Sequence, residues 1–364
     1  SPPGRFQPDP KLPADAGVPY VIVTGEALAP SFQKLADYKR ANGLPAQVVT
    51  VEWLAKSAYY PGVDLPERLY RLLQDLRLNW RTRWILIGGD VDVVPPQRIR
   101  ATRGAHGGNQ ISSDVFYSDV LPAEHDDPDK VAGYSWNGNG DRFIGDAAKD
   151  GFDLVAELYV GRVPVETKEE AEAYLDKYFE YVNASAKDAA WCARALVVGA
   201  NEFGKRQGEV AELFRELGGA GYTAELLVER KPNPVQAITD EMNRGYGFFD
   251  FFCHGCPTHF WAMDDHTSWG VVQVKTLKNA GMYPVVFANS CDTDEFEKED
   301  CLGEVILLQP KAGAIAYLGY SNLSFGSPVD QEIYRILFSG DCPQLGRALV
   351  EAKKKVAGDL WVQQ

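Results

Sequence analysis

The sequence predicts an α/β protein in which mostly parallel sheets are flanked by helices. Two observations predict this fold class. Short apolar runs rich in β-branched and aromatic residues alternate along the chain with segments whose apolar residues follow the helical period. Several of these runs contain almost no polar residue, as expected of strands that are covered by helices on both faces of a sheet.

The first half of the chain contains this alternation up to a helix near residue 181. The expected strands are 20–24, 46–51, 84–88 and 158–162, and the expected helices are 29–42, 65–78 and 168–181. Gly43 directly follows the first helix, as is typical of a helix end. Strand and helix in strict alternation are characteristic of a doubly wound sheet.

The second half repeats the alternation. The expected strands are 195–200, 223–228, 247–253, 284–290 and 313–319, and the expected helices are 208–217, 234–244, 301–309, 328–338 and 344–356. A chain of 364 residues is longer than one hydrophobic core usually serves. We therefore expect two α/β subdomains, 1–185 and 186–364, each with its own sheet.

Composition and charge limit the classes of partner. The formal net charge is −14, which argues against nucleic acid as a main partner. No apolar run reaches the ~18 residues that a membrane-spanning helix needs. Six cysteines in a chain of this length do not make a disulfide scaffold. We expect a monomer without an organic cofactor, and the proline-rich start without Met is expected to be a processed end.

Three strand ends carry a carboxylate, an imidazole and a thiol. The runs 195–200, 247–253 and 284–290 are followed closely by Glu202, His254 and Cys291. In open α/β sheets, chemistry collects just outside the carboxyl ends of the strands. If the three strands are neighbours, Cys291 is placed as a nucleophile, His254 as its base and Glu202 as the acid that orients the base.

Each of these residues also has a purely structural interpretation. Cys291 could be a buried cysteine and His254 a hydrogen-bonded core histidine. Polar neighbours of Cys291 and the glycine after His254 favour catalysis, because a glycine lets a substrate carbonyl approach the backbone. The N–H groups of Gly255 and Cys291 would then form an oxyanion hole. Asn201 could replace Glu202 as the group that orients the imidazole.

A segment at 97–155 interrupts the α/β pattern and is rich in glycine and oxygen-bearing side chains. Its candidate calcium ligands are Asp114, Asn137, Asn139, Asp141 and Asp146. Oxygen ligands with interleaved glycines suit a structural calcium loop, although no Glu stands at the closing position of an EF-hand. An ordinary acidic surface loop is the alternative.

A second cluster of metal-binding residue types lies around the expected imidazole base. Cys253, Cys256 and His259 have zinc-like spacing, with His254 and His266 nearby. A second ligand pair at matching spacing is missing, and alternation along a strand turns Cys253 away from His254. A non-catalytic or zinc-binding protein and a Cys253–Cys256 disulfide are the corresponding alternatives.

Taken together, the motifs resemble the gingipain family of cysteine peptidases. The matching segments are 253–255 followed by Trp261, 288–291, 301–305 and 313–319 in the second half, and 86–95, 113–117 and 157–162 in the first. The resemblance implies a caspase-like fold and a secreted cysteine endopeptidase of bacterial type, or one at the cell surface. It places Cys291 as nucleophile, His254 as base and Glu202 as the supporting acid. It also implies structural calcium.

The resemblance further implies a substrate pocket. Phe325 matches an aromatic wall, and the other candidates are Trp261, Ser290 and Asp330. Members of the family that cleave after arginine or lysine place an aspartate at the base of this pocket; no residue here matches it, and Asp330 lies slightly beyond the lysine-specific position. Protein or peptide substrates are expected, with a basic residue before the cleaved bond as one candidate. Some relatives are sortases, so a transpeptidase using the same Cys–His dyad is the alternative activity.

Overall fold

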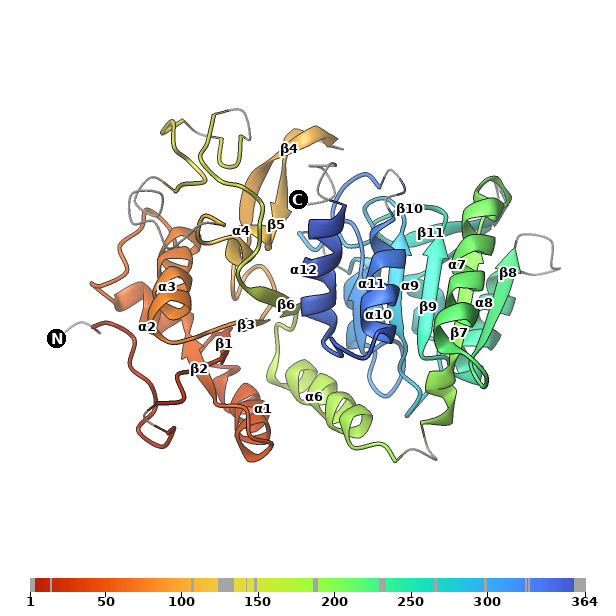
Figure 1. Cartoon of the computed structure of the whole chain (residues 1–364), viewed down its shortest axis with the longest axis horizontal. Coiled ribbons are helices and arrows are strands. Elements are labelled where there is room, and N and C mark those ends of the chain that lie inside the picture. Colours follow the sequence, from red (N-terminus) through yellow and green to blue (C-terminus); the bar gives the residue numbers. More distant parts are fainter. Residues whose placement is uncertain are drawn as a thin grey trace. The chain divides into compact units, whose positions relative to one another are not determined.

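The computed structural model describes most of the chain. The described residues are 4–13, 15–105, 108–123, 134–141, 143–146, 149–185, 189–228, 234–264, 267–297, 300–324, 326 and 328–356. They form two compact units, which divide between Ala171 and Glu172. Figure 1 shows the course of the chain through both units. Among the described residues, no helix is both long enough and apolar enough to cross a membrane.

The first unit is built on a four-stranded parallel sheet of order β2-β1-β3-β6. The strands are β1 (Tyr20–Thr24), β2 (Ala46–Thr50), β3 (Trp84–Gly88) and β6 (Tyr159–Val163), and the helices are α1 (Ala29–Ala41), α2 (Val51–Lys56), α3 (Leu65–Asn79) and α4 (Val115–Ser118). The Asp64 carboxylate caps α3 by accepting from the N–H of Glu67. Gly88 is required because a Cβ there would lie 2.5 Å from the Phe32 ring of α1.

The second unit, Glu172–Val356, contains a five-stranded parallel sheet of order β14-β13-β9-β7-β8. Its strands are β7 (Arg194–Gly199), β8 (Thr223–Val228), β9 (Phe248–Phe252), β13 (Val285–Asn289) and β14 (Ala316–Leu318). Its helices are α6 (Lys168–Val182, which begins just before the division), α7 (Gly204–Gly218), α8 (Pro234–Arg244), α9 (Val271–Val274), α10 (Leu302–Leu308), α11 (Val329–Phe338) and α12 (Leu345–Lys355).

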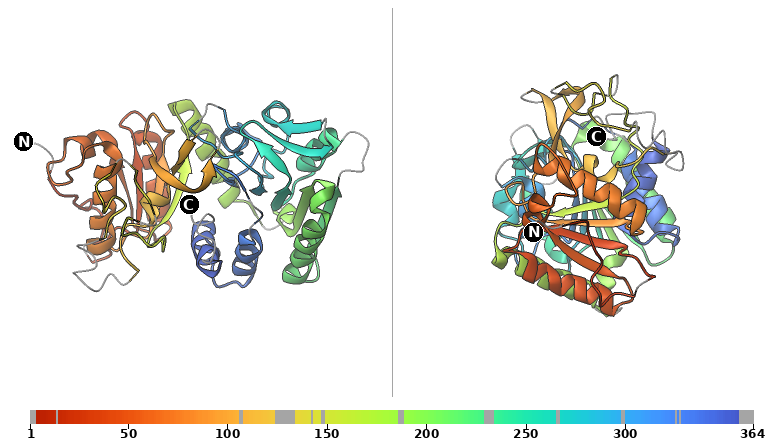
Figure 2. Two further views of the ribbon diagram at one scale, coloured as in Figure 1. Left: turned by 90° about the horizontal axis from the view of Figure 1, so that it is seen from above. Right: turned by 90° about the vertical axis from the view of Figure 1, so that its left-hand side faces the viewer.

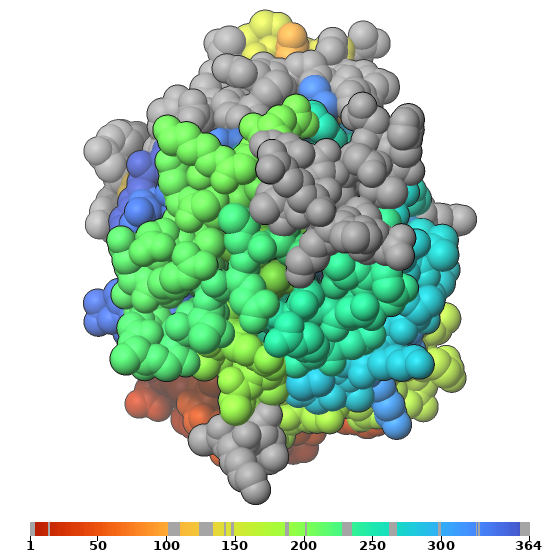
Figure 3. All heavy atoms as spheres, turned by 90° about the vertical axis from the view of Figure 1, so that its right-hand side faces the viewer, coloured from red at the N-terminus to blue at the C-terminus, as the bar shows by residue number. Residues whose placement is uncertain are grey.

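Helices cover both faces of this five-stranded sheet (Figure 2). Helix α7 packs with α11 and α12 on one face, whereas α8, α9 and α10 pack together on the other. Figure 3 views the unit from the side of the edge strand β8, with α7 and α8 at the surface. Phe249, Phe251, Val286 and Ala288 are buried in the core between the sheet and the α8–α10 layer. The expected fold class, α/β with mostly parallel sheets flanked by helices, is confirmed.

The division of the chain lies earlier than the expected one at residues 185 and 186. Helix α6 belongs almost wholly to the second unit, because its side chains form contacts with that unit. The buried ammonium group of Lys177 donates to the carbonyl oxygens of Leu307, Gln309 and Ala312, at 2.6–3.2 Å. These oxygens lie at the end of α10 and just after it, so Lys177 satisfies carbonyls that the helix leaves free.

Two antiparallel elements were not expected from the sequence. The strands β4 (Gln97–Ala105) and β5 (Gly108–Ser113) form a hairpin in the first unit. The strands β10 (His254–Cys256), β11 (His259–Asp264) and β12 (Thr267–Gly270) form a small sheet in the second. The hairpin lies in the segment 97–155, which the sequence predicts to be loop, and the sequence predicts no element for 254–270, because short strands with mixed polarity leave little periodic signal.

A buried carboxyl group in the first unit makes its stability depend on pH. Glu157 is 7% exposed and accepts from the N–H groups of Val120 and Leu121, both at 3.1 Å. Burial raises its pKa to about 7. A carboxyl group whose pKa is raised in the folded state stabilises the fold below its unfolded value, and this stabilisation is lost as the pH rises through the folded value.

We therefore expect the chain to lose up to ~3 kcal/mol of unfolding free energy between pH 5 and pH 8 through this group. Glu157→Gln keeps an oxygen acceptor for the two N–H groups but removes the titration. Thermal unfolding of both proteins at the two pH values tests this. The same pH dependence in the wild type and in Glu157→Gln would contradict it.

Candidate active site

The parallel sheet of the second unit brings three strand ends together. β9 lies between β7 and β13, and Gly199, Phe252 and Asn289 stand in register at the carboxyl ends of these strands. The chain winds outward in opposite directions from β7 and β9, so the order of the strands reverses between them. Such a switch point is where open α/β sheets bind their ligands.

An imidazole and a carboxylate meet at this switch point. His254 Nε2 lies 2.7 Å from Glu202 Oε1. Glu202 belongs to the short turn that follows β7, and His254 opens β10 directly beyond β9. The ring of Phe203 packs edge-on against the imidazole, with 5.4 Å between ring centroids. Glu202 and Phe203 thus fix the orientation of the His254 ring, and Glu202 occupies its Nε2 side.

Cys291 follows β13 in a tight turn. The backbone of Asp292 adopts a left-handed conformation with φ 58°, and its N–H donates to the carbonyl of Asn322 at 3.0 Å. The N–H of Ser324 donates to the Cys291 sulfur at 3.3 Å. The thiol is half-buried, and this burial raises its pKa above the ordinary value. An isolated thiol in this position would stay protonated at neutral pH, so its ionisation requires a base.

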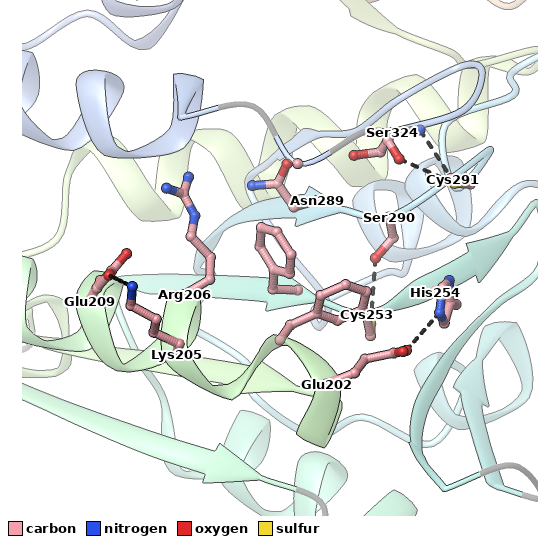
Figure 4. Close-up of a pocket in the computed structure, with 13 residues that line it drawn as sticks. Glu202, Lys205, Arg206, Glu209, Cys253, His254, Asn289, Ser290, Cys291 and Ser324 are labelled. Carbon is pink, nitrogen blue, oxygen red and sulfur yellow. Dashed lines mark hydrogen bonds and ion pairs between the residues drawn. The ribbon is translucent and has the colours of Figure 1, made fainter.

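The thiol, the imidazole and the carboxylate line one cavity of about 560 Å³ (Figure 4). The full lining consists of Glu202, Phe203, Lys205, Arg206, Glu209, Phe252, Cys253, His254, Asn289, Ser290, Cys291, Ser324 and Gly326. The first five come from the turn after β7 and from α7, and the others come from the ends of β9 and β13 and from the segment before α11. The sequence predicted that three of these residues, Glu202, His254 and Cys291, would lie close together.

Gly255 holds two backbone segments close together. A Cβ at this position would lie 2.7 Å from the Cys291 carbonyl oxygen and 2.9 Å from Ser290 Cβ. No ordinary side chain fits at these distances. The absence of a side chain therefore lets the imidazole-bearing strand β10 approach the turn that carries the thiol.

A buried ion pair supports the cavity wall. Arg206, on α7, donates to Asp330 Oδ1 at 2.6 Å, and Asp330 is fully buried at the start of α11. The guanidinium group also stacks over the Phe252 ring, 5.7 Å from its centroid. Burial raises the pKa of Asp330 to about 6 and that of the neighbouring Asp250 well above its usual range. The Tyr334 hydroxyl donates to Asp250 at 2.5 Å.

The predicted pocket residues lie in different places. Ser290 lines the cavity, and its hydroxyl contacts the Cys253 sulfur at 3.4 Å. Asp330 was expected in the pocket but lies beneath the wall, because it is the buried partner of Arg206. Trp261 is absent from the lining; it is exposed on β11, opposite His254 in the strand register. Phe325 lies outside the described residues.

Several residues that line the cavity were not predicted from the sequence. Arg206 and Lys205 sit in the first turn of α7, four and three residues after Glu202, and Ser324 contacts the thiol from a distant loop. Arg206 and Lys205 could have been predicted as lining residues because both follow Glu202 closely in the sequence. No local signal pointed to Ser324, because its contact with Cys291 spans 33 residues of sequence.

Most of the predicted calcium ligands have protein partners through their side chains. Arg162 binds both carboxylate oxygens of Asp114, at 2.7 and 2.8 Å. Asp146 pairs with Arg100 at 3.0 Å and with Lys149 at 3.3 Å. The remaining candidates are Asn137, Asn139 and Asp141, and the Asn139 amide donates to Asp141 at 2.9 Å. In the described part of the chain, no three His, Cys, Asp or Glu residues gather as metal ligands would. Asp114 and Asp146 are therefore engaged in ion pairs with basic side chains, and the calcium site stays a prediction.

The zinc and disulfide alternatives disagree with the structure. All six cysteines are free, so Cys253 and Cys256 are not bonded. Cys253 is buried against Ser290, and burial raises its pKa to about 12. Cys256 instead contacts His259. The three side chains do not converge on one point, because Cys256 and His259 pair across β10 and β11 whereas Cys253 is buried against Ser290.

Comparisons with known proteins agree with the resemblance found in the sequence. A model of peptidase family C25 matches residues 13–363. Lys-gingipain of Porphyromonas gingivalis is 30% identical over 186 residues, which cover 49% of this chain and 10% of that protein. Gingipain R2 of the same organism is 24% identical over 195 residues, covering 49% of this chain and 26% of that protein. A protein of Archaeoglobus fulgidus is 24% identical over 345 residues, covering 83% and 75%.

Solved structures share the fold. The crystal structure of the Arg-specific cysteine proteinase gingipain R matches with a TM-score of 0.70 and 18% identity, over 98% of this chain and 77% of that one. The complex of the pro- and mature domains of Porphyromonas gingivalis RgpB matches with a TM-score of 0.71 and 18% identity, over 94% and 75%. The expected caspase-like fold and the resemblance to the gingipain family are confirmed.

The close approach at Gly255 predicts a specific mutational effect. We expect Gly255→Ala to cost about 1–3 kcal/mol, because the added Cβ overpacks the Cys291 turn. It should also change the rate at which iodoacetamide alkylates Cys291. Gly208→Ala in α7 is the matched control, since a Cβ there meets nothing within 4 Å. Equal melting temperatures and alkylation rates for the two variants would contradict this account.

The ion pair in the cavity wall predicts a pH-dependent loss of stability. Arg206→Met leaves Asp330 buried without its cation, which should cost ~3 kcal/mol at pH 8. The loss should shrink at pH 5, where Asp330 takes up a proton and its charge no longer needs a partner. Chemical denaturation at both pH values measures this. The control is Lys205→Met, because Lys205 is 94% exposed; an equal loss in both variants would refute the role of the ion pair.

Proposed function

Because the chain belongs to peptidase family C25, we propose that it is a cysteine endopeptidase whose nucleophile is Cys291 and whose base is His254. The main support is the shared cavity, in which a thiol and an imidazole lie at neighbouring strand ends. A thiol with a raised pKa needs such a base, and an imidazole held by a carboxylate can serve as one. Glu202 is the proposed positioning residue for His254.

In the proposed mechanism, the Cys291 sulfur attacks the carbonyl carbon of a peptide bond. His254 takes the thiol proton and returns it to the leaving amine, which yields a thioester. Because Glu202 occupies the Nε2 side of the ring, Nδ1 is the nitrogen left for the thiol. The Glu202 carboxylate stabilises the imidazolium that forms. Water then hydrolyses the thioester, with His254 again acting as base.

The backbone around Gly255 supplies the proposed oxyanion hole. Gly255 and Cys291 approach so closely that a Cβ at Gly255 would meet the Cys291 carbonyl. Their N–H groups are the donors that we propose for the negative oxygen of the tetrahedral intermediate. The missing side chain at Gly255 also lets a substrate carbonyl come within hydrogen-bond distance of the backbone.

A basic residue before the cleaved bond is the specificity that the relatives' names suggest, since they include Lys-gingipain and an Arg-specific proteinase. Among the described lining residues, Glu209 is the carboxylate that does not hold His254. It faces Lys205 at 3.9 Å in an exposed pair, which binds weakly. We therefore propose Glu209 as the anchor for a basic side chain.

Secretion or display at the cell surface, a monomeric state and structural calcium remain further parts of the proposal. Secretion is supported by the similarity to gingipains. The matched segment covers only a tenth of the length of Lys-gingipain.

The central experiment replaces the nucleophile. Cys291→Ala should lower the cleavage of a mixed peptide library by about a thousandfold or more, because removing the nucleophile leaves only binding and oxyanion stabilisation. Cys192→Ala is the control, since Cys192 lies outside the cavity. Cleavage that survives in Cys291→Ala would exclude the mechanism. The cleaved sites reveal the residue preference, and Glu209→Gln should weaken a basic one. Ligated product on addition of an amine would instead indicate transpeptidation.

The dependence of the thiol on its base gives a second test. In His254→Ala, alkylation of Cys291 by iodoacetamide should require a higher pH than in the wild type. The half-buried thiol must then ionise without the imidazole base. The rate is measured from pH 5 to pH 10 by mass spectrometry. Superimposable pH profiles for the two proteins would show that His254 does not serve the thiol.

A further inference from the structure

A second thiol and a second imidazole lie on the same hairpin as His254. In the register of β10 and β11, His254 faces Trp261, Gly255 faces Phe260, and Cys256 faces His259. Alternation along strands places His254, Cys256 and their partners on one face of the hairpin and Phe260 on the other. Phe260 is fully buried, so the face that carries Cys256 is the outer one.

The two groups are in direct contact. The Cys256 sulfur lies 3.1 Å from His259 Nδ1 and 3.5 Å from Nε2. The hydroxyl of Thr258 also lies 3.1 Å from Nδ1. Burial lowers the pKa of His259, so its ring is neutral at neutral pH and has a nitrogen that can accept a proton. An imidazole nitrogen in contact with a thiol can take its proton when the sulfur reacts.

The environment of Cys256 differs from that of the other cysteines outside the cavity. Cys301 and Cys342 are buried, and Cys192 is partly exposed but has a pKa that burial raises. Cys256 is partly exposed and lies outside the lining of the cavity that holds Cys291. A soluble reagent can therefore reach this sulfur without entering the proposed catalytic cavity.

We propose that Cys256 and His259 form a second reactive thiol–imidazole pair, which is a site of modification by low-molecular-weight disulfides. His259 takes the Cys256 proton, and the thiolate attacks one sulfur of the reagent. A Cys256–reagent disulfide forms, the reagent's own disulfide breaks, and the released thiolate takes the proton from His259. The Cys256 sulfur is oxidised and one half of the reagent is reduced, so that electrons and protons balance.

The adduct would stand beside the imidazole of the proposed catalytic pair. Residues two apart on a strand are separated by about 7 Å along it, and their side chains share a face. Cys256 is two residues after His254. Small disulfides persist in oxidising surroundings outside cells, which is where the proposed secretion would take the protein. Formation of the adduct itself does not depend on the proposed peptidase activity.

The test uses Cys291→Ala, in which the cavity thiol is absent, and glutathione disulfide as the probe. Intact-mass spectrometry should show one glutathione added, and peptide mapping should place it on Cys256. Cys256→Ser in the same background should abolish the fast addition, whereas Cys192→Ser should leave it unchanged. His259→Gln should slow the addition about tenfold at pH 7, because the thiol loses its base. Circular dichroism verifies that each variant is folded.

Two results would overturn the proposal. One is modification of Cys192 as fast as that of Cys256, which would show that exposure alone decides the rate. The other is an unchanged rate in a folded His259→Gln variant, which would show that the imidazole does not activate the thiol. Since the rates are measured without a catalytic cysteine, the outcome is separate from the outcome of the peptide-cleavage experiment.

Discussion

The parallel pairing of β7, β9 and β13 is the constraint on which the rest of the site depends. Their last residues stand in register, so the groups that follow each strand emerge side by side at one edge of the sheet. β9 lies in the middle, and a shift of one residue there would turn His254 away from Glu202, because successive residues face opposite sides. The buried apolar residues that this sheet packs against α8–α10 resist such a shift.

Buried charge sets a second constraint on the cavity. Arg206 forms part of the wall, yet its partner Asp330 is fully buried at the start of a helix far along the chain. Removing either charge leaves the other without compensation in a poorly solvated place. The pair therefore ties α7 to α11 beneath the cavity, and it turns a carboxylate that could have faced a substrate into a structural group.

The fold alone does not assign a function to this chain, and the residues of the site are needed as well. Solved structures at 18% identity establish the caspase-like architecture, which by itself hosts more than one chemistry. The family match over residues 13–363 and the joint presence of a thiol and an imidazole in one cavity support the proposed acyl transfer through sulfur. The lining itself mixes both signs of charge, so the residue preference follows from neither fold nor family alone.

Local periodicity in the amino-acid sequence was enough to predict the α/β class, nearly every strand and helix of the two large sheets, and the residues that follow the strands. It placed Glu202, His254 and Cys291 at strand ends but could not show which strands are neighbours. The neighbouring strands, the hairpin face that carries Cys256 and the burial of Asp330 become visible only in the folded chain. Register, helix docking and the pairing of buried charges arise between segments far apart in the chain, where local periodicity carries no information.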